Sequence, residues 1–527
     1  MSNVLVREQY IIERELMPVI QSIVNKEIRD MQTSGHKYFS PNMSGHDSEI
    51  GRSNSIVISR INFETVENSE EPAIVNQTSS GAETNRHVCL GSISCVKTVR
   101  PLLNYWVHLP QHREHLVTII ERFFLGYSAA SRQELEAVNW KMHSVNKKYF
   151  LSIIEIMKLD PLFKLYKFQF HNGKSSVDDL LNPNSLVKDS STSATTPATF
   201  PIEKKNLSVD STQSNISKEL DIWVDFWDVN QVNYPLNNNE ITNDFKKIQT
   251  LASIAYSADW LANKLSKRFN HLSKKFSSSI YQSNSNIGIK KSTHQELIMP
   301  LKLAFLSGFR EFSKLSEETT AILRGELQLA CFHYLHLVAK LDFSNNHNYK
   351  NNMKNKKRVM DGRPEPEALI GAWNQYIVSF QDAILVAADP SFLCLIFSPL
   401  CYLAPRILMR CMRSLFESSF KLTSEGQEIK TKLLRAILAC QQGLSMLFES
   451  SNLESSSNKL LQSILNEEFG KIRKFVQLLG CLTAELRLFV SQNGSVFTKE
   501  ELNSLWQQTK DRGAQEVLQD FMSSINR

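Results

Sequence analysis

The chain has little glycine and little proline, with 18 and 16 among its 527 residues. Phosphate-cradling loops, tight hairpins and β-sandwich corners need glycine, because other side chains adopt the required backbone conformations only at a cost. The sequence also lacks a Walker loop, a dinucleotide fingerprint, a G-x-S-x-G motif and an H-E-x-x-H motif. The scarcity of glycine favours long helices. The empty motif search leads us to expect no enzyme, no cofactor and no small-molecule substrate.

The numbers of positively and negatively charged residues are nearly equal. Lysine and arginine number 60 and the acidic residues 54, which gives a formal net charge of +6. Much of the excess lies in an Asn/Lys-rich stretch around Lys350 to Arg363. Binding to nucleic acid requires a basic face. The linear sequence shows no such face, so we predict no nucleic-acid partner.

The eight cysteines form no C-x-x-C motif, and six of them lie inside apolar helical patterns. They are typical of small core residues in a reducing compartment, rather than of a disulfide framework or a zinc site. The first seventeen residues carry charges where a signal peptide needs a continuous apolar core. We therefore expect a cytoplasmic protein.

The stretch from Leu315 to Phe343 predicts a helix around which the rest of the chain is arranged. Its apolar residues recur at steps of three and four, and this stripe consists of Leu323, Leu327, Ala330, Cys331, Tyr334, Val338 and Leu341. Other apolar residues, such as Leu329 and Leu335, lie off the stripe, so neighbouring helices must wrap this one. Charged residues interrupt the pattern too often for a membrane span. We predict a buried central helix with Leu323, Leu327, Cys331, Tyr334 and Val338 in the core.

Helical patterns alternate with stretches rich in serine, asparagine and threonine, which we interpret as disordered inserts. The predicted fold is all-α, an elongated rod of stacked helical bundles with long disordered inserts. The expected segments are an N-terminal amphipathic helix at 1–32, a flexible linker at 33–95, a bundle at 96–171, a disordered linker at 172–217, a bundle with the central helix at 218–343, an Asn/Lys-rich loop at 344–366 and a C-terminal bundle at 367–527.

The longest apolar run extends from Ala383 to Pro405 and has Asp389 as its only charge. Its length would suffice for a membrane span. Two buried helices that meet at Asp389–Pro390, with further breaks at Pro399 and Pro405, explain the same pattern. An aspartate and three prolines favour the buried helices.

Two pairs of histidines stand one helical turn apart, His112 with His115 and His333 with His336. Such a pair is able to hold a metal ion. No third ligand follows at a useful spacing, and a hydrogen-bonded core histidine is the commoner arrangement in an apolar helix. We therefore predict no metal site.

One aromatic cluster beside a linker is a candidate for docking a partner. Trp223, Phe226 and Trp227 alternate with acidic residues in the segment ELDIWVDFWDVNQ. Tryptophan is enriched at interfaces, although these residues would pack equally well on the chain's own bundle. Both alternatives stay open, and the acidic character argues against binding phosphate.

The central helix also resembles a known family. The segment ELQLACFHYLHLVAKLDF is similar to a segment of exocyst complex component four (the secretion subunit numbered eight in yeast). The residues that carry the likeness are Glu326, Leu327, Cys331, Phe332, His333, Tyr334, Leu335, Ala339 and Lys340. The helical segments that follow also resemble the family in their order, as does RPLLNYWVHLPQHREHLVTIIERFFLGY upstream, so the likeness extends from about Val96 to the C-terminus.

The resemblance implies a non-enzymatic subunit of the complex that tethers secretory vesicles to the plasma membrane before fusion. Its partners would be the other exocyst subunits. It would be cytoplasmic and would associate peripherally with membranes at sites of secretion. The family's N-terminal coiled-coil region has no counterpart here beyond Asn3 to Met31, which leaves stable assembly open. The alternative is a generic helical scaffold or adaptor that binds one partner through Trp223, Phe226 and Trp227.

Overall fold

The computed structural model describes residues 12–41, 87–137, 152–158, 163, 241, 243–283, 291–339, 366–419, 424–450, 456–478, 487–488, 492, 497 and 512–525. Nearly all of these residues are helical and none of them lies in a strand. The predicted all-α fold is therefore confirmed for the described part of the chain. The rod shape and the disorder of the inserts stay predictions.

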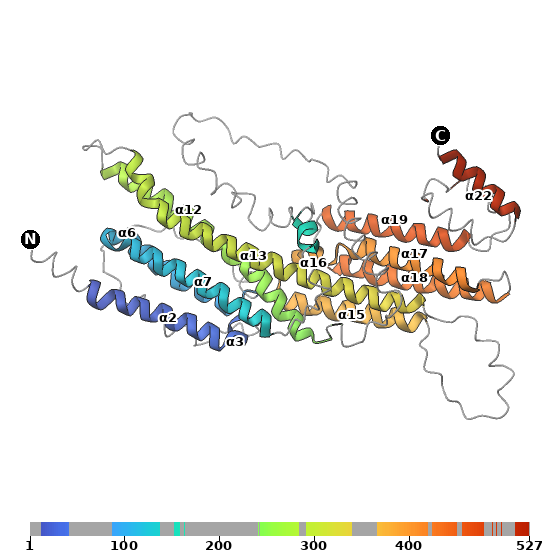
Figure 1. Cartoon of the computed structure of the whole chain (residues 1–527), viewed down its shortest axis with the longest axis horizontal. Coiled ribbons are helices and arrows are strands. Elements are labelled where there is room, and N and C mark those ends of the chain that lie inside the picture. Colours follow the sequence, from blue (N-terminus) through green and yellow to red (C-terminus); the bar gives the residue numbers. More distant parts are fainter. Residues whose placement is uncertain are drawn as a thin grey trace, which may run out of the picture. The chain divides into compact units, whose positions relative to one another are not determined.

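The helices vary widely in length (Figure 1). In chain order the elements are the π-helix η1 (Ile12–Leu16), α2 (Met17–Thr33), α3 (Gly35–Phe39), α6 (Leu90–His108), the short 3-10 helix η3 (Pro110–His112), α7 (Arg113–Ala137), α12 (Phe245–Ser283), α13 (Lys291–Ala339), α15 (Pro366–Ala387), α16 (Pro390–Phe397), α17 (Leu400–Ser419), α18 (Ser424–Ser450), α19 (Ser456–Leu478) and α22 (Arg512–Ile525).

The chain folds into two compact units, each assembled from separate segments. Unit 1 comprises Met1–Asn215, Asp244–Leu323 and Asp382–Phe392, and unit 2 comprises Ile216–Asn243, Arg324–Gln381 and Leu393–Arg527. The three consecutive bundles predicted from the sequence stay a prediction, and the two units are divided at other residues. The reason is that α13 and α15 each contribute residues to both units, so their unbroken helical periods conceal the boundaries.

Unit 1 is built on helix pairs that pack along their lengths. Helix α7 lies against α2 and α6, and α6 lies against α12 (Figure 1). The core between α7, α12 and α13 is aromatic. The ring of Phe124 meets those of Phe305 and Phe312 edge-on, with centroids 5.3 Å and 5.5 Å apart. Phe269 of α12 lies 5.2 Å from Phe305. Each such pair adds about 0.5–1.5 kcal/mol beyond the burial of area.

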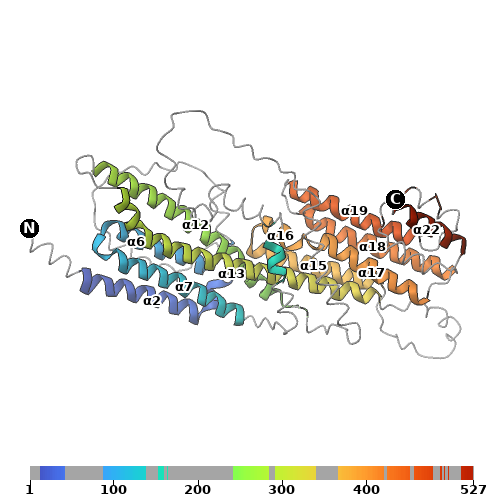
Figure 2. The same ribbon diagram turned by 45° about the horizontal axis from the view of Figure 1, so that its top comes forward.

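Unit 2 contains α17, α18 and α19, which lie side by side (Figure 2). A row of aromatic rings joins α13 to α15 in this unit. Tyr334 lies 6.1 Å from Trp373 and 5.7 Å from Tyr376 between ring centroids. Tyr376 contacts Phe380, and Phe380 meets Phe397 of α16 edge-on at 6.0 Å.

The long apolar run is divided into separate helices near Asp389 and Pro399. Asp389 Oδ1 accepts a hydrogen bond of 2.9 Å from the amide of Ser391, which caps the start of α16. Pro399 separates α16 from α17. The further break predicted at Pro405 is wrong, since this proline lies inside α17. The segment Pro390–Arg410 is long and apolar enough for a span, since an 18-residue window of it has a mean hydropathy of 1.8, but 89% of that window is buried inside the protein. A core helix has the same property.

The first linker is shorter at both ends than the sequence indicated. Helix α3 lies within its predicted range of 33–95, and α6 begins at Leu90. Tertiary contacts explain both differences: the Phe39 ring packs edge-on against Tyr127, and the amide of Cys89 donates to Ser257 Oγ at 2.9 Å. The insert predicted at 172–217 lies outside the described residues. So does the loop predicted at 344–366, apart from Pro366, which begins α15.

Two glycines inside helices test the packing, because replacing each by alanine should change the free energy of unfolding in opposite directions. A Cβ atom on Gly308 would lie 2.6 Å from Cδ2 of Phe124, a ring already held between Phe305 and Phe312. We expect Gly308→Ala to lower the free energy of unfolding by about 1–2 kcal/mol, because overpacking outweighs the better helix propensity of alanine. A Cβ on Gly371 of α15 would meet nothing within 4 Å. We expect Gly371→Ala to raise the free energy of unfolding by about 0.5–1 kcal/mol.

Urea unfolding of the two variants beside the wild type measures both effects. Equal and positive changes at both glycines would show that α7 and α13 do not approach as closely as described.

Candidate functional site

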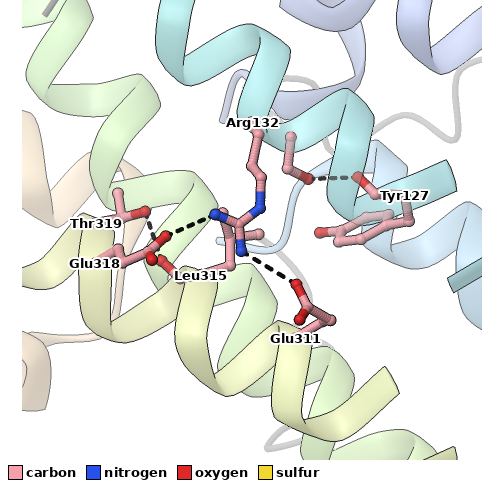
Figure 3. A network of polar contacts seen from close by, with 7 residues as sticks. Tyr127, Arg132, Glu311, Leu315, Glu318 and Thr319 are labelled. Atoms are coloured by element: carbon pink, nitrogen blue, oxygen red, sulfur yellow. Dashed lines mark hydrogen bonds and ion pairs between the residues drawn. The ribbon is translucent and has the colours of Figure 1, made fainter. Parts of the chain in front are cut away.

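Arg132 of α7 joins two turns of α13 in unit 1 (Figure 3). One terminal nitrogen of its guanidinium donates to Glu318 Oε2 at 2.9 Å and the other to Glu311 Oε2 at 3.2 Å. The two glutamates are seven residues apart and therefore lie on one side of α13. The fork of arginine donors suits such a double contact. Lys158 adds a further ion pair with Glu317 at 2.9 Å.

These ion pairs are partly open to solvent, so each contributes little to stability. The side chains of Arg132, Glu311 and Glu318 are 35%, 37% and 26% exposed. Ion pairs at such positions are worth about 0.2–1 kcal/mol. Their geometry fixes the longitudinal register of α7 against α13.

A buried polar network lies in the interior of the same unit. The Tyr127 hydroxyl and Ser92 Oγ are 2.6 Å apart, and Ser92 Oγ donates to the carbonyl of Ser257 at 3.3 Å. Tyr127 is therefore the donor to Ser92. Burial raises the pKa of the Tyr127 phenol well above its usual range, and the neighbouring Cys89 raises it further. The phenol stays protonated at neutral pH, so it serves as a hydrogen-bond donor that links α7 to α6 and α12.

The cysteines of the described residues are buried and carry no disulfide. Those whose side chains are described are Cys89, Cys95, Cys331, Cys394, Cys401 and Cys440, while the side chain of Cys411 on α17 lies outside the description. Burial raises the pKa of the Cys394 thiol to about 11 and that of Cys440 to about 12. It also raises the pKa of Cys95 well above its usual range. Only the thiolate is an effective nucleophile or metal ligand, so these side chains act as small core residues.

The histidines of the two pairs lie in different environments. His112 is buried while His115 is exposed, which separates their environments. His333 lies in the core of unit 2, where burial lowers its pKa, and the ring of His336 stacks on Phe332 at 5.5 Å. Within the described residues no three His, Cys, Asp or Glu side chains gather where they could hold a metal ion.

The predicted core residues of α13 occupy different environments. Leu323, Leu327 and Cys331 are completely buried. Tyr334 is partly exposed and contributes its ring to the aromatic row with Trp373 and Tyr376. Val338 lies within α13, but its side chain is outside the described residues, and so are Trp223, Phe226 and Trp227.

One residue that the sequence did not single out as core is Arg324. It is completely buried on α13, and its guanidinium donates to the carbonyl of Leu395 at 3.4 Å. The sequence feature that indicates its burial is its position among apolar residues at helical spacing. Arginine is rarely buried unless it is paired, so sequence reasoning alone assigns it to the surface.

Burial on α13 predicts a large effect for a charge at Leu327. We expect Leu327→Asp to lower the free energy of unfolding by about 3–5 kcal/mol, because it places a carboxylate without a designed partner in the core. The matched control is Leu303→Asp on the same helix, where the leucine is 59% exposed. That change should stay within about 0.5 kcal/mol. Thermal unfolding followed by circular dichroism measures the effects of the two substitutions. An equal melting temperature for Leu327→Asp and the wild type would contradict the burial of Leu327.

Burial of the thiols predicts protection from alkylation. Iodoacetamide at pH 8 should modify Cys95, Cys394 and Cys440 about 100-fold more slowly, or slower still, in the native protein than in guanidinium, because thiolate is scarce and access is blocked. Peptide mapping by mass spectrometry resolves each cysteine. Native and unfolded rates that agree at Cys440 would show that this part of unit 2 is open.

No family model matches the chain, and no curated protein matches it. Any assignment of function therefore depends on the sequence pattern and on the contacts described above.

Proposed function

We propose that the chain is a non-enzymatic subunit of the exocyst that helps to dock secretory vesicles at the plasma membrane. The single observation that carries the proposal is the resemblance of the segment around Glu326 to Lys340 to exocyst complex component four. Its partners would be the other exocyst subunits, and its membrane association would be peripheral and through the complex.

The place of the resembling residues in the fold supports this proposal. Six of them, Glu326, Leu327, Cys331, Phe332, His333 and Leu335, are buried on α13. Buried residues at helical spacing determine how a helix packs among its neighbours. A likeness in these residues is therefore a likeness in the bundle, as expected of a family whose members are helical rods.

The mechanism we propose is mechanical. Helical units would present their outer faces to sister subunits, while internal contacts such as those of Arg132 and Tyr127 keep the helices in register. Exposed apolar side chains on such faces would become buried when a sister subunit binds. On α18 of unit 2, Leu438 is 41% exposed and Met446 is 67% exposed, and the two lie about two turns apart on one side of the helix.

The alternative function is that of a generic helical scaffold or adaptor that binds one partner. The aromatic and acidic segment with Trp223, Phe226 and Trp227 favours it, because two tryptophans beside a linker are typical of an interface. The two functions differ in how many partners bind and in which residues hold them.

Affinity purification of the tagged full-length protein from its own cells tests the proposal. We expect mass spectrometry to find the other exocyst subunits in amounts comparable with the bait. The double variant Trp223→Ala, Trp227→Ala serves as the comparison and should recover the same subunits. Absence of all exocyst subunits from the wild-type purification contradicts the proposal. Loss of every partner from the double variant, with its helicity unchanged, would support the adaptor instead.

A further inference from the structure

Two neighbouring helices of unit 1 carry positive charge almost without acidic residues. Helix α6 has no aspartate or glutamate, and the single acidic residue of α12, Asp259, is 1% exposed. The exposed lysines and arginine in the middle of these helices form a surface that we call the basic face, and its residues are Lys97, Arg100, Lys264, Lys267 and Lys274. The linear sequence did not indicate this face, because its two halves lie far apart along the chain.

The basic row of α12 points away from α13. Phe269 marks the side of α12 that packs on α13, through its contact with Phe305. Successive residues of a helix are rotated by about 100°. Lys267 is then about 160° from Phe269, and Lys264 and Lys274 are each about 140° from it. The row is about 15 Å long at 1.5 Å per residue.

The basic row of α6 runs beside that of α12. Ser92 marks the inner side of α6, where it contacts Tyr127 and Ser257. By the same rotation, Lys97 lies about 140° and Arg100 about 80° from Ser92. Because α6 packs along α12, both rows lie at exposed positions of one helix pair.

Within the described part of the chain, the cations of the basic face form no ion pair. None of its residues takes part in the ion pairs found among the described residues. The ammonium of Lys264 lies over the ring of Trp260, 5.6 Å from its centroid. The pKa of Lys267 is lowered by partial burial and by the charge of Lys264. A surface that carries several positive charges without ion-pair partners attracts a molecule with many negative charges.

The side chains around these cations distinguish one polyanion from another. The aromatic residues Tyr105, Trp106, Tyr256, Trp260 and Phe269 of these helices are buried. Among the side chains described on α6 and α12, no fully exposed ring is therefore present for single-stranded bases to stack on. None of the exposed large apolar side chains found in the described residues lies on α6 or α12, so the face has nothing to insert into a bilayer. Four of its five cations are lysines, which act as hydrated point charges rather than as bidentate forks. These features favour attraction to a charged surface over recognition of individual groups.

We propose that the basic face binds the anionic surface of a phospholipid bilayer by electrostatic attraction, without insertion. This inference deepens the proposed function and rests on it for the setting, a tether that works beside a membrane. A lysine or arginine near an anionic bilayer strengthens partition about five-fold.

Flotation of the full-length protein with vesicles tests the proposal. The probe is a vesicle of phosphatidylcholine with about 30% phosphatidylserine, compared with phosphatidylcholine alone. We expect binding to the anionic vesicles only, and its loss when salt is raised from about 0.1 M to about 0.5 M. The variant Lys97→Gln, Lys264→Gln, Lys267→Gln, Lys274→Gln should weaken partition by about 100-fold or more.

A second variant controls for net charge. Arg122, Arg310, Lys314 and Arg435 are exposed on α7, α13 and α18, and their replacement by glutamine removes the same four charges. We expect this control to bind vesicles within about five-fold of the wild type. Equal loss in the two variants, or binding by the wild type to neutral vesicles, overturns the assignment to the basic face. Because all eight positions are at the surface, both variants should keep the circular-dichroism spectrum of the wild type.

Two further readouts separate this inference from the function it extends. Fluorescence anisotropy with a DNA duplex of about 30 base pairs tests the other polyanion. Binding to DNA through the same lysines, without binding to vesicles, overturns the inference in favour of nucleic acid. Affinity purification of the basic-face variant should still recover the exocyst subunits. If the wild-type protein recovers the exocyst subunits but does not bind anionic vesicles, only the inference about the basic face is overturned. If it binds anionic vesicles but recovers no exocyst subunits, only the proposed function is overturned.

Discussion

The burial of α13 is the constraint on which the other contacts depend. From Thr319 to Leu335 no residue is exposed, and only Gly325 and Tyr334 are even partly so. A helix that is enclosed over about five turns must be surrounded on every side. Its polar residues must also find partners inside, as Thr319 does with the carbonyl of Leu315 at 2.7 Å. The arrangement of the chain follows from supplying those neighbours, which come from segments before and after α13 in the sequence, such as α7 and α15.

In unit 1 the neighbours of α13 are held by three kinds of contact with different strengths. Aromatic packing around Phe124 and Phe305 supplies most of the stabilisation, because these rings bury large apolar areas. The buried hydrogen bonds of Tyr127 and Ser92 add less, but they must be complete, since an unsatisfied polar group in the core is costly. The ion pairs of Arg132 at the edge contribute least to stability and serve to fix the register.

The sequence predicted features that depend on local periodicity and missed those that depend on contacts distant along the chain. The apolar stripe through Leu323 and Leu327 anticipated the burial of α13, and Asp389–Pro390 anticipated a helix boundary. Helix α3 was missed because five residues show no helical period; Phe39 is held by the distant Tyr127. The boundary between the units at Leu323 falls inside one unbroken helix, where periodicity gives no sign of it. The basic face was missed for the same reason, since its residues lie on α6 and α12, which are far apart along the chain and come together only by packing. The aromatic docking segment stays a prediction.

Hydrogen–deuterium exchange of the full-length protein, followed by mass spectrometry, tests the burial of α13 most directly. An enclosed helix opens only when its unit unfolds, while a helix end with few buried contacts opens locally. Peptides that cover Thr319 to Leu335 should exchange more slowly than those from α22 and from the start of α2. Those from Arg324 to Leu335, which belong to unit 2, should also exchange together, at the rate at which that unit unfolds. Exchange of this stretch as fast as that of α22 would contradict the account, because α13 would then not be the helix around which the chain is packed.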